Sequence, residues 1–99
     1  METITIAQVR TRQPGRLLRQ LCNHWRHKFP VERDAELAGR IELPGGPCEL
    51  RAEGETLHVR LSLPDAAAID RMEQVVAEHL QRFAQDETLA FDWVRQPAG

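Results

Sequence analysis

The first ten residues alternate between polar and apolar positions. Ile4, Ile6 and Val9 lie on or near one face of an extended chain over residues 3–10, and β-branched residues dominate its start. Alternation with period two and β-branching are both typical of a half-buried strand. The pattern therefore predicts a first strand over residues 3–10, ended by the turn sequence Gln13-Pro14-Gly15.

Helical spacing replaces the alternation over residues 15–28. The apolar side chains of this segment form one stripe: Leu17, Leu18, Leu21, Cys22, Trp25 and Phe29. Pro14 can occupy the first turn of a helix, where its missing N–H costs nothing, and Pro30 prevents the helix from continuing. The segment is predicted to be an amphipathic helix whose opposite face is polar and basic.

The middle of the chain has the pattern of a meander. Residues 31–38 are ambiguous, with a short extended piece possible at Val31. Residues 40–43, 48–53 and 57–63 then alternate, and they are separated by the turn sequence Pro44-Gly45-Gly46-Pro47 and by Gly54. Three antiparallel strands joined by tight turns are expected here.

A second helix is predicted to begin at Pro64-Asp65. Asp65 places a negative charge at the positive end of the helix dipole. The inward stripe of this helix comprises Ile69, Met72, Val76, His79, Leu80 and Phe83, whereas Arg71, Glu78 and Arg82 face outward. Residues 88–94 alternate again, with Leu89, Phe91 and Trp93 on one face, and predict a last strand. Residues 96–99 are expected to be a frayed tail.

These elements predict one α+β domain over residues 1–99. The order is β-α-β-β-β-α-β, and two amphipathic helices pair naturally with a one-sided antiparallel sheet. We expect a two-layer sandwich in which about five strands carry both helices on one face. A chain of 99 residues has room for a single small core.

The composition is that of a soluble globular protein, with 41% apolar and 28% charged residues. Apolar runs are far shorter than the ~20 residues that cross a bilayer, and the N-terminus lacks the basic and apolar regions of a signal peptide. We therefore expect a cytoplasmic protein without membrane association. In a reducing compartment Cys22 and Cys48 are expected to be free thiols.

The net charge of −2 conceals a division along the chain. Residues 1–33 carry seven basic and two acidic residues, a net charge of +5, while residues 34–99 carry six basic and thirteen acidic residues, a net charge of −7. This division suggests an acidic protein partner, an anionic ligand or self-association. A nucleic acid is a less suitable partner, because the domain is net negative and its aromatic residues fall on apolar stripes.

No recognisable catalytic constellation is present. Gly45 and Gly46 lie in a strand-to-strand turn rather than before a helix, so they do not form a phosphate-binding loop. The acidic residues fall mostly at outward strand positions and turns, where a solvated face is the simpler interpretation. We predict no catalytic residue and favour a non-enzymatic module.

One cluster of histidines and cysteines is distinctive. His24 and His27 are three residues apart on the first helix, a spacing that lets two side chains reach one ion. His24 lies at the border of the apolar stripe and Cys22 within it, and His79 lies on the inward face of the second helix. If the helices lie side by side, Cys22, His24 and His79 converge at their seam as a metal or ligand site. The alternative is a core cysteine, a core histidine and two surface histidines.

The basic face of the first helix is the second candidate site. It comprises Arg16, Arg19, Arg26 and Lys28. A solvated face is one interpretation, and contact with phosphate groups or with an acidic protein partner is another.

Three stretches of the chain carry distinctive sequence patterns. They are Gly15 to Val31 with the sequence GRLLRQLCNHWRHKFPV, the pattern Gly46, Cys48, Leu50 and Ala52, and the segment from Glu73 to Ala84 before a final Asp92-Trp93. Together they resemble a bacterial family named domain of unknown function 2218. The resemblance implies no established activity and leaves any cofactor undetermined. It does imply a setting, because similar domains occur beside or fused to flavin-dependent siderophore-interacting proteins. A role near ferric-siderophore use is therefore expected from the resemblance.

Overall fold

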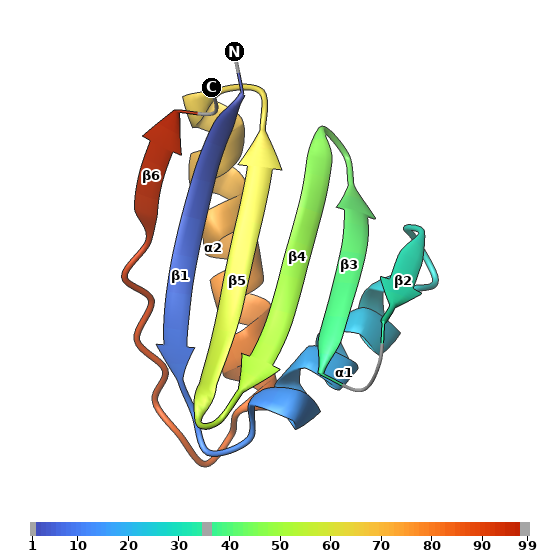
Figure 1. Cartoon of the computed structure of the whole chain (residues 1–99), viewed down its shortest axis with the longest axis vertical. Helices are drawn as coiled ribbons and strands as arrows, with labels where there is room; N and C mark the ends of the chain where they lie inside the picture. Colours follow the sequence, from blue (N-terminus) through green and yellow to red (C-terminus); the bar gives the residue numbers. More distant parts are fainter. Residues whose placement is uncertain (1, 35–36, 98–99) are drawn as a thin grey trace.

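A computed structural model describes residues 2–34 and 37–97 of the chain. The elements follow in the order β1 (Thr3–Arg10), α1 (Pro14–Trp25), β2 (Val31–Arg33), β3 (Ala38–Leu43), β4 (Gly46–Glu53), β5 (Thr56–Leu63), α2 (Ala66–Phe83) and β6 (Val94–Pro97). All the strands join one antiparallel sheet in the order β2-β3-β4-β5-β1-β6 (Figure 1).

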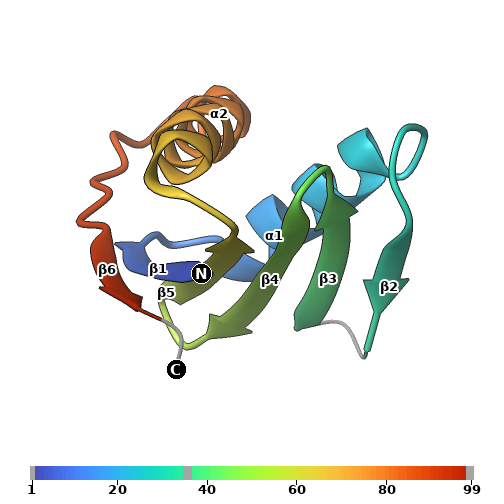
Figure 2. The same cartoon turned by 90° about the horizontal axis from the view of Figure 1, so that it is seen from above.

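Both helices cover the same face of the sheet, which confirms the predicted α+β fold in two layers (Figure 2). α1 contacts β3 and β4, whereas α2 contacts β5 and β1. The helices therefore lie next to each other with a seam between them, and the opposite face of the sheet has no helix over it. In the described part of the chain, neither helix is long and apolar enough to cross a membrane.

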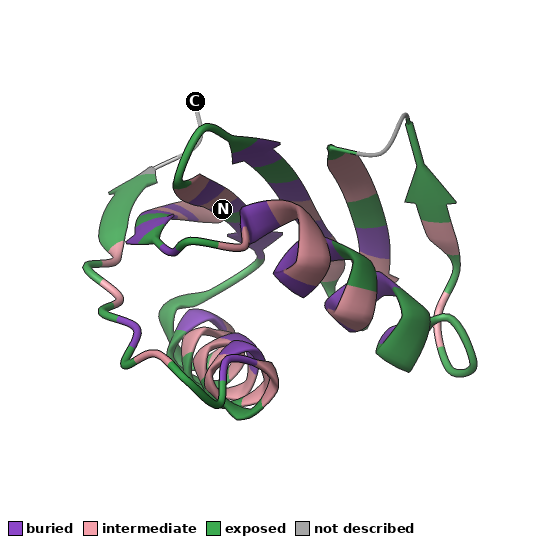
Figure 3. Ribbon diagram, turned by 90° about the horizontal axis from the view of Figure 1, so that it is seen from below, coloured by how far each residue is buried: buried purple, intermediate pink, exposed green. Residues whose placement is uncertain are grey.

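The helix stripes and the turns follow the predictions. α1 buries Leu17, Leu18, Leu21, Cys22 and Trp25, and α2 buries Ile69, Val76 and Leu80 (Figure 3). Asp65 caps α2 through its Oδ1, which accepts a hydrogen bond of 2.8 Å from the Ala68 N–H. Gly45 and Gly54 occupy the two hairpin turns with φ of 96° and 61°, a conformation that favours glycine.

The sheet has one strand more than the predicted order. β2 pairs antiparallel with β3, so that Glu32 lies opposite Arg40. Three residues are too few to show alternation, which is why residues 31–38 were ambiguous in the sequence. Residues 35 and 36 of that segment lie outside the described part of the chain.

The predicted last strand over residues 88–94 is wrong. Residues 88–93 form no strand, and the edge strand β6 pairs instead over Val94–Pro97 with the start of β1. Leu89 is buried, and Phe91 and Trp93 pack against the core with their rings stacked 6.0 Å apart. Alternation here reflects side chains that pack inward from an irregular segment.

The predicted frayed tail over residues 96–99 begins too early, because Gln96 and Pro97 belong to β6, while residues 98 and 99 lie outside the described part.

The prediction that Ile4, Ile6 and Val9 lie on or near one face of the first strand is wrong, because Val9 faces the helices and the two isoleucines do not. Thr5, Ala7 and Val9 are the buried residues of this strand, whereas Ile4 and Ile6 are half-buried on the face without helices. β-branched residues occur on both faces of the strand, so hydrophobicity alone does not determine which face of β1 points toward the helices. The buried Thr5 hydroxyl donates a hydrogen bond of 2.7 Å to Oε2 of Glu73 on α2, which satisfies its polar group.

Candidate functional site

A hollow of about 630 Å³ lies where the seam between α1 and α2 reaches the end of β3. We call it the helix-seam groove. Its apolar lining comprises Trp25, Phe29, Leu43, Pro44, Ala67, Ala68, Met72 and Val75. Its polar lining comprises His24, Lys28, Arg71 and His79, all of them basic side chains. The groove thus combines an apolar interior with polar side chains that are all basic. Among the described residues, neither an aspartate nor a glutamate lines it.

The C-terminal end of α1 supplies one wall. Trp25 points into the core with the apolar stripe, and His24 precedes it by about 100° around the helix, which turns His24 toward α2. The helix ends at Trp25 rather than at residue 28, because the N–H groups of Lys28 and Phe29 both donate to the Trp25 carbonyl in a closing turn. This turn brings Lys28 to the same groove.

α2 supplies the facing wall. Arg71, Met72, Val75 and His79 recur at helical spacing along one side of it. Nδ1 of His79 lies 2.7 Å from the Val75 carbonyl oxygen one turn earlier. A carbonyl oxygen only accepts hydrogen bonds, so we assign the proton to Nδ1. In the neutral ring, Nε2 of His79 then carries the free lone pair.

The two helices place His24 and His79 side by side. Their ring centroids are 5.1 Å apart, and the His79 ring also lies 5.1 Å from the Trp25 ring. Phe83 completes the group, with its centroid 5.9 Å from that of His24. The convergence of His24 and His79 that the sequence suggested is therefore present in the structure.

Positive groups around the pair are not neutralised by acids. Within residues 2–34 and 37–97, no ion pair involves His24, Lys28, Arg71 or His79. Desolvation lowers the pKa of His24, and the positive charges of His79, Arg82, Lys28 and His27 lower it further. The surroundings of His24 thus favour its neutral form and would stabilise an added negative charge.

Cys22 does not join this group. Its side chain faces the sheet, where its Sγ lies against Gly39 of β3 rather than in the groove. Burial raises the pKa of the Cys22 thiol, with a smaller opposing effect from Arg33, and burial also raises the pKa of the Cys48 thiol. Both thiols are free and buried and stay protonated at neutral pH.

The other predicted side chains are spread over α1 and the turn after it. His27 is exposed and does not line the groove, although its charge acts on His24. Arg16 has a structural role, because its guanidinium donates to the Gln13 side chain and, at 3.1 Å, to the Phe83 carbonyl.

Arg19 and Arg26 are exposed outside the groove. Of the predicted basic face, only Lys28 belongs to the groove.

The described residues contain no group of three or more His, Cys, Asp or Glu side chains that could hold a metal ion. His24 and His79 alone supply two ring nitrogens. A metal at this pair would need its remaining ligands from solvent or from a bound molecule.

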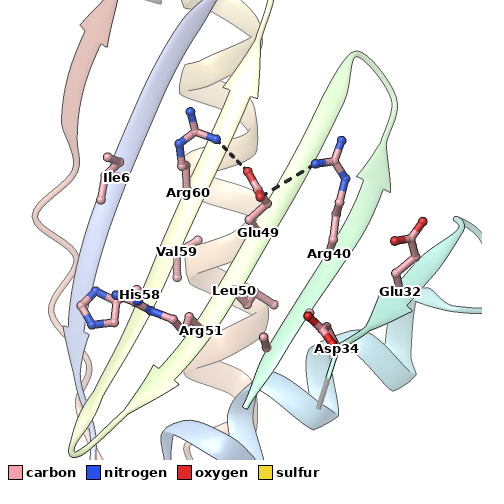
Figure 4. Close-up of a pocket in the computed structure, with 12 residues that line it drawn as sticks. Ile6, Glu32, Asp34, Arg40, Glu49, Leu50, Arg51, His58, Val59 and Arg60 are labelled. Carbon is pink, nitrogen blue, oxygen red and sulfur yellow. Dashed lines mark hydrogen bonds and ion pairs between the residues drawn. The ribbon is translucent and has the colours of Figure 1, made fainter. Parts of the chain in front are cut away.

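A second hollow, of about 530 Å³, lies on the face of the sheet without helices (Figure 4). One row of neighbouring residues crosses it in the order Ile6, Arg60, Glu49, Arg40 and Glu32, so that basic and acidic side chains alternate. Arg60 and Arg40 both pair with Glu49, at 2.7 and 3.8 Å. The charges of this row neutralise one another. The open face of the sheet therefore attracts a charged ligand less strongly than the helix-seam groove does.

Sequence reasoning missed Arg71 as a site residue. The helical pattern predicts an outward-facing Arg71, and the side chain is exposed, yet it lines the groove. Its position one residue before Met72 on the inward stripe was the available signal, because a long side chain at the border of a stripe can reach either side.

Comparisons with known proteins identify one family and one similar solved structure. The profile of a family described as "Uncharacterized protein conserved in bacteria (DUF2218)" matches residues 6–94. An NMR structure of PA4090 from Pseudomonas aeruginosa is 38% identical, with 99% of this chain and 98% of that chain covered and a TM-score of 0.73. No curated protein matches the chain significantly.

Proposed function

This chain belongs to the bacterial family DUF2218, and we propose that it is a non-enzymatic accessory module that binds a small anion with an apolar body in the helix-seam groove. One observation carries the proposal. Four basic side chains without acidic partners among the described residues surround an apolar hollow of about 630 Å³. Binding pockets commonly combine a mostly apolar lining with a few convergent polar groups.

The chemistry of the lining supports this ligand class. Lys28 and Arg71 attract a carboxylate or similar anion, and Arg71 can bind it with two parallel hydrogen bonds. Trp25, Phe29 and Met72 favour an aromatic or alkyl body, because burying apolar surface stabilises by roughly 25 cal/mol per Å². An inorganic anion contacts only the basic residues of the groove, and an uncharged apolar molecule contacts only the apolar lining. An amphipathic carboxylate contacts both and is therefore expected to bind better than a free inorganic anion.

Isothermal titration calorimetry in buffer containing a chelator tests the proposal. Benzoate and octanoate are the probes, with benzamide as the uncharged analogue and inorganic phosphate as the anion without an apolar body. We expect both carboxylates to bind more tightly than either control. Losing one partly exposed charge interaction of about 1 kcal/mol should weaken benzoate binding about fivefold in Lys28→Ala and in Arg71→Ala.

Arg19→Ala is the matched control, because Arg19 lies on the same helix outside the groove. Equal binding of benzoate and benzamide, or equal weakening by Arg19→Ala and Lys28→Ala, would refute the proposed groove.

The predicted acidic protein partner would use a different surface. Arg19 and Arg26 are exposed and extend the basic surface of α1 and its closing turn beyond the groove. Association through these side chains should weaken strongly with salt, because exposed charges are screened over about 8 Å at physiological ionic strength. Analytical ultracentrifugation at low and high salt, alone and with an acidic peptide, separates self-association and peptide binding from small-anion binding.

Metal binding by His24 and His79 is the second candidate function. The ring separation of 5.1 Å and the Nδ1–H of His79, which is held by the Val75 carbonyl, favour it, whereas the Cys22 thiol lies against Gly39 and does not line the groove. Elemental analysis of untagged protein purified without chelators tests it. Stoichiometric metal that disappears in His24→Ala and in His79→Ala would support a metal site, and metal-free protein would not.

A role in siderophore-iron use enters the proposal only through the ligand, which would be a fragment of a siderophore. A catechol carboxylate combines a negative charge with a flat apolar ring, the two properties that the groove accommodates. Including such a catechol carboxylate beside benzoate in the titrations shows whether the groove distinguishes siderophore-like fragments from other aromatic acids.

A further inference from the structure

We propose that the helix-seam groove binds a divalent transition metal and an organic carboxylate together, with His24 and His79 holding the metal and the carboxylate completing its coordination. This inference rests on the proposed function, because the second ligand is the anion of that proposal. It goes further in making the metal and the anion two parts of one site rather than alternatives.

The first argument is geometric. With metal–nitrogen distances of about 2.0–2.1 Å and tetrahedral angles, two imidazoles on one zinc ion have ring centroids about 5 Å apart. The centroids of His24 and His79 are 5.1 Å apart in the structure. The pair therefore has the spacing of two metal ligands without any movement of either helix.

The second argument concerns the orientation of His79. A metal-binding histidine usually donates its other ring N–H to a carbonyl or carboxylate, which fixes the ring and directs the lone pair at the metal. His79 Nδ1 has such a partner in the Val75 carbonyl oxygen, at 2.7 Å. Its Nε2 lone pair is then available to a metal while the ring is neutral.

The third argument is that the site is incomplete by itself. Two ring nitrogens leave a tetrahedral ion two open positions, and the described residues offer no third His, Cys, Asp or Glu ligand. Lys28 and Arg71 stand at the groove and repel a bare cation. A carboxylate offsets this repulsion and supplies oxygen for the open positions, so each component should favour the binding of the other.

Other groups that face the pair fit this arrangement. His27 and Lys28 in the turn after α1 and Arg82 on α2 act electrostatically on His24, and all three are basic. Their positive charges favour an anion beside the metal.

Calorimetric titration of the whole chain with Zn²⁺, with and without saturating benzoate, tests this inference. We expect one zinc per chain and a zinc affinity that benzoate raises by about fivefold or more, within the range of about 5- to 150-fold typical of coupled sites. Thermodynamic reciprocity requires zinc to raise the benzoate affinity by the same factor. Co²⁺ substitution should give the intense visible absorption of a tetrahedral site, and benzoate should change that spectrum.

His24→Ala and His79→Ala should abolish the stoichiometric zinc binding. His79→Gln provides a second variant for the half-buried position, and circular dichroism confirms that each variant is folded. His27→Ala and His58→Ala are the matched controls, because both histidines lie outside the groove, and they should bind zinc as the natural chain does.

The outcomes separate this inference from the proposed function. Zinc binding that survives in folded His24→Ala and His79→Ala variants overturns the inference, as does zinc affinity that benzoate leaves unchanged or lowers. If benzoate nevertheless binds in the presence of a chelator, the proposed function stands. If benzoate binds neither with chelator nor with zinc, both the proposed function and the inference fall.

Discussion

The Sγ atom of Cys22 lies 2.8 Å from the point at which a Cβ would sit on Gly39. α1 and β3 approach each other so closely here that a Cβ on residue 39 would force the Cys22 thiol or the backbone to shift. The contact also explains why Cys22 is absent from the helix-seam groove, since its thiol fills the space above the sheet that a side chain at Gly39 would take.

Gly39→Ala should therefore destabilise the fold. Overpacking in a well-packed interior typically costs about 1–3 kcal/mol, and we expect a loss of that size in the free energy of unfolding from urea denaturation. Cys22→Ala removes the atom that a new Cβ would meet. The double variant should be less destabilised than the sum of the two single variants, and strict additivity would contradict the contact.

The hydrogen bond from Thr5 to Glu73 should be measurable as stability. Thr5→Val keeps the shape of the side chain but removes a buried donor to a carboxylate, a change worth about 1–3 kcal/mol. Thr3→Val is the matched control, because Thr3 is only half-buried on the same strand. A loss in the Thr3→Val variant as large as in Thr5→Val would show that the Glu73 contact contributes little.

Lowering the pH should reduce the stability contributed by the contact between the β1–α1 loop and the segment after α2. Hydrogen bonds from the Arg12 backbone N–H and the Thr11 hydroxyl lower the pKa of Glu87 below its ordinary 4.5. A carboxyl with a lowered pKa contributes stability above its unfolded pKa, and this stability is lost as the pH falls below 4.5 toward the folded pKa.

Glu87→Gln should therefore flatten the decline of stability below pH 4.5, as measured by urea unfolding at several pH values. Asp92→Asn, which changes an exposed carboxylate, is the control and should leave the profile unchanged. Parallel profiles for the natural chain and Glu87→Gln would argue against these hydrogen bonds in solution.

The basic surroundings of His24 should appear in an NMR titration of its ring. Burial and the neighbouring positive charges lower the pKa of His24 below 6.5. Because the neutral ring is favoured, protonation of His24 opposes folding, and this effect grows as the pH falls through the interval below 6.5. Arg82→Gln should raise the pKa of His24, whereas Arg19→Gln should not. A His24 pKa at or above 6.5 in the natural chain would contradict the described electrostatics.

Particular residues show how far the sequence could lead. The stripe from Leu17 to Trp25, the Asp65 cap and the hairpin glycines were predictable because each depends on local spacing or backbone conformation. The convergence of His24 and His79 was also predictable, since both lie at or near inward stripes of neighbouring helices.

Long-range register and packing account for the errors. Thr5 faces inward because it lies opposite Leu61 and bonds Glu73, which is 68 residues away in the sequence. Cys22 lies in the predicted stripe, yet its direction within that stripe depends on Gly39, and Arg16 is engaged by the Phe83 carbonyl. None of these partners can be identified from spacing within one segment.

Chemical-shift mapping of the ¹⁵N-labelled chain with benzoate, in buffer with a chelator, tests the central claim most directly. The account predicts saturable shifts that concentrate at the amides of His24, Lys28, Arg71 and His79 and that shrink in Arg71→Ala. Shifts confined to Arg19 and Arg26 on the exposed basic surface, or no saturable shifts at all, would contradict binding in the helix-seam groove.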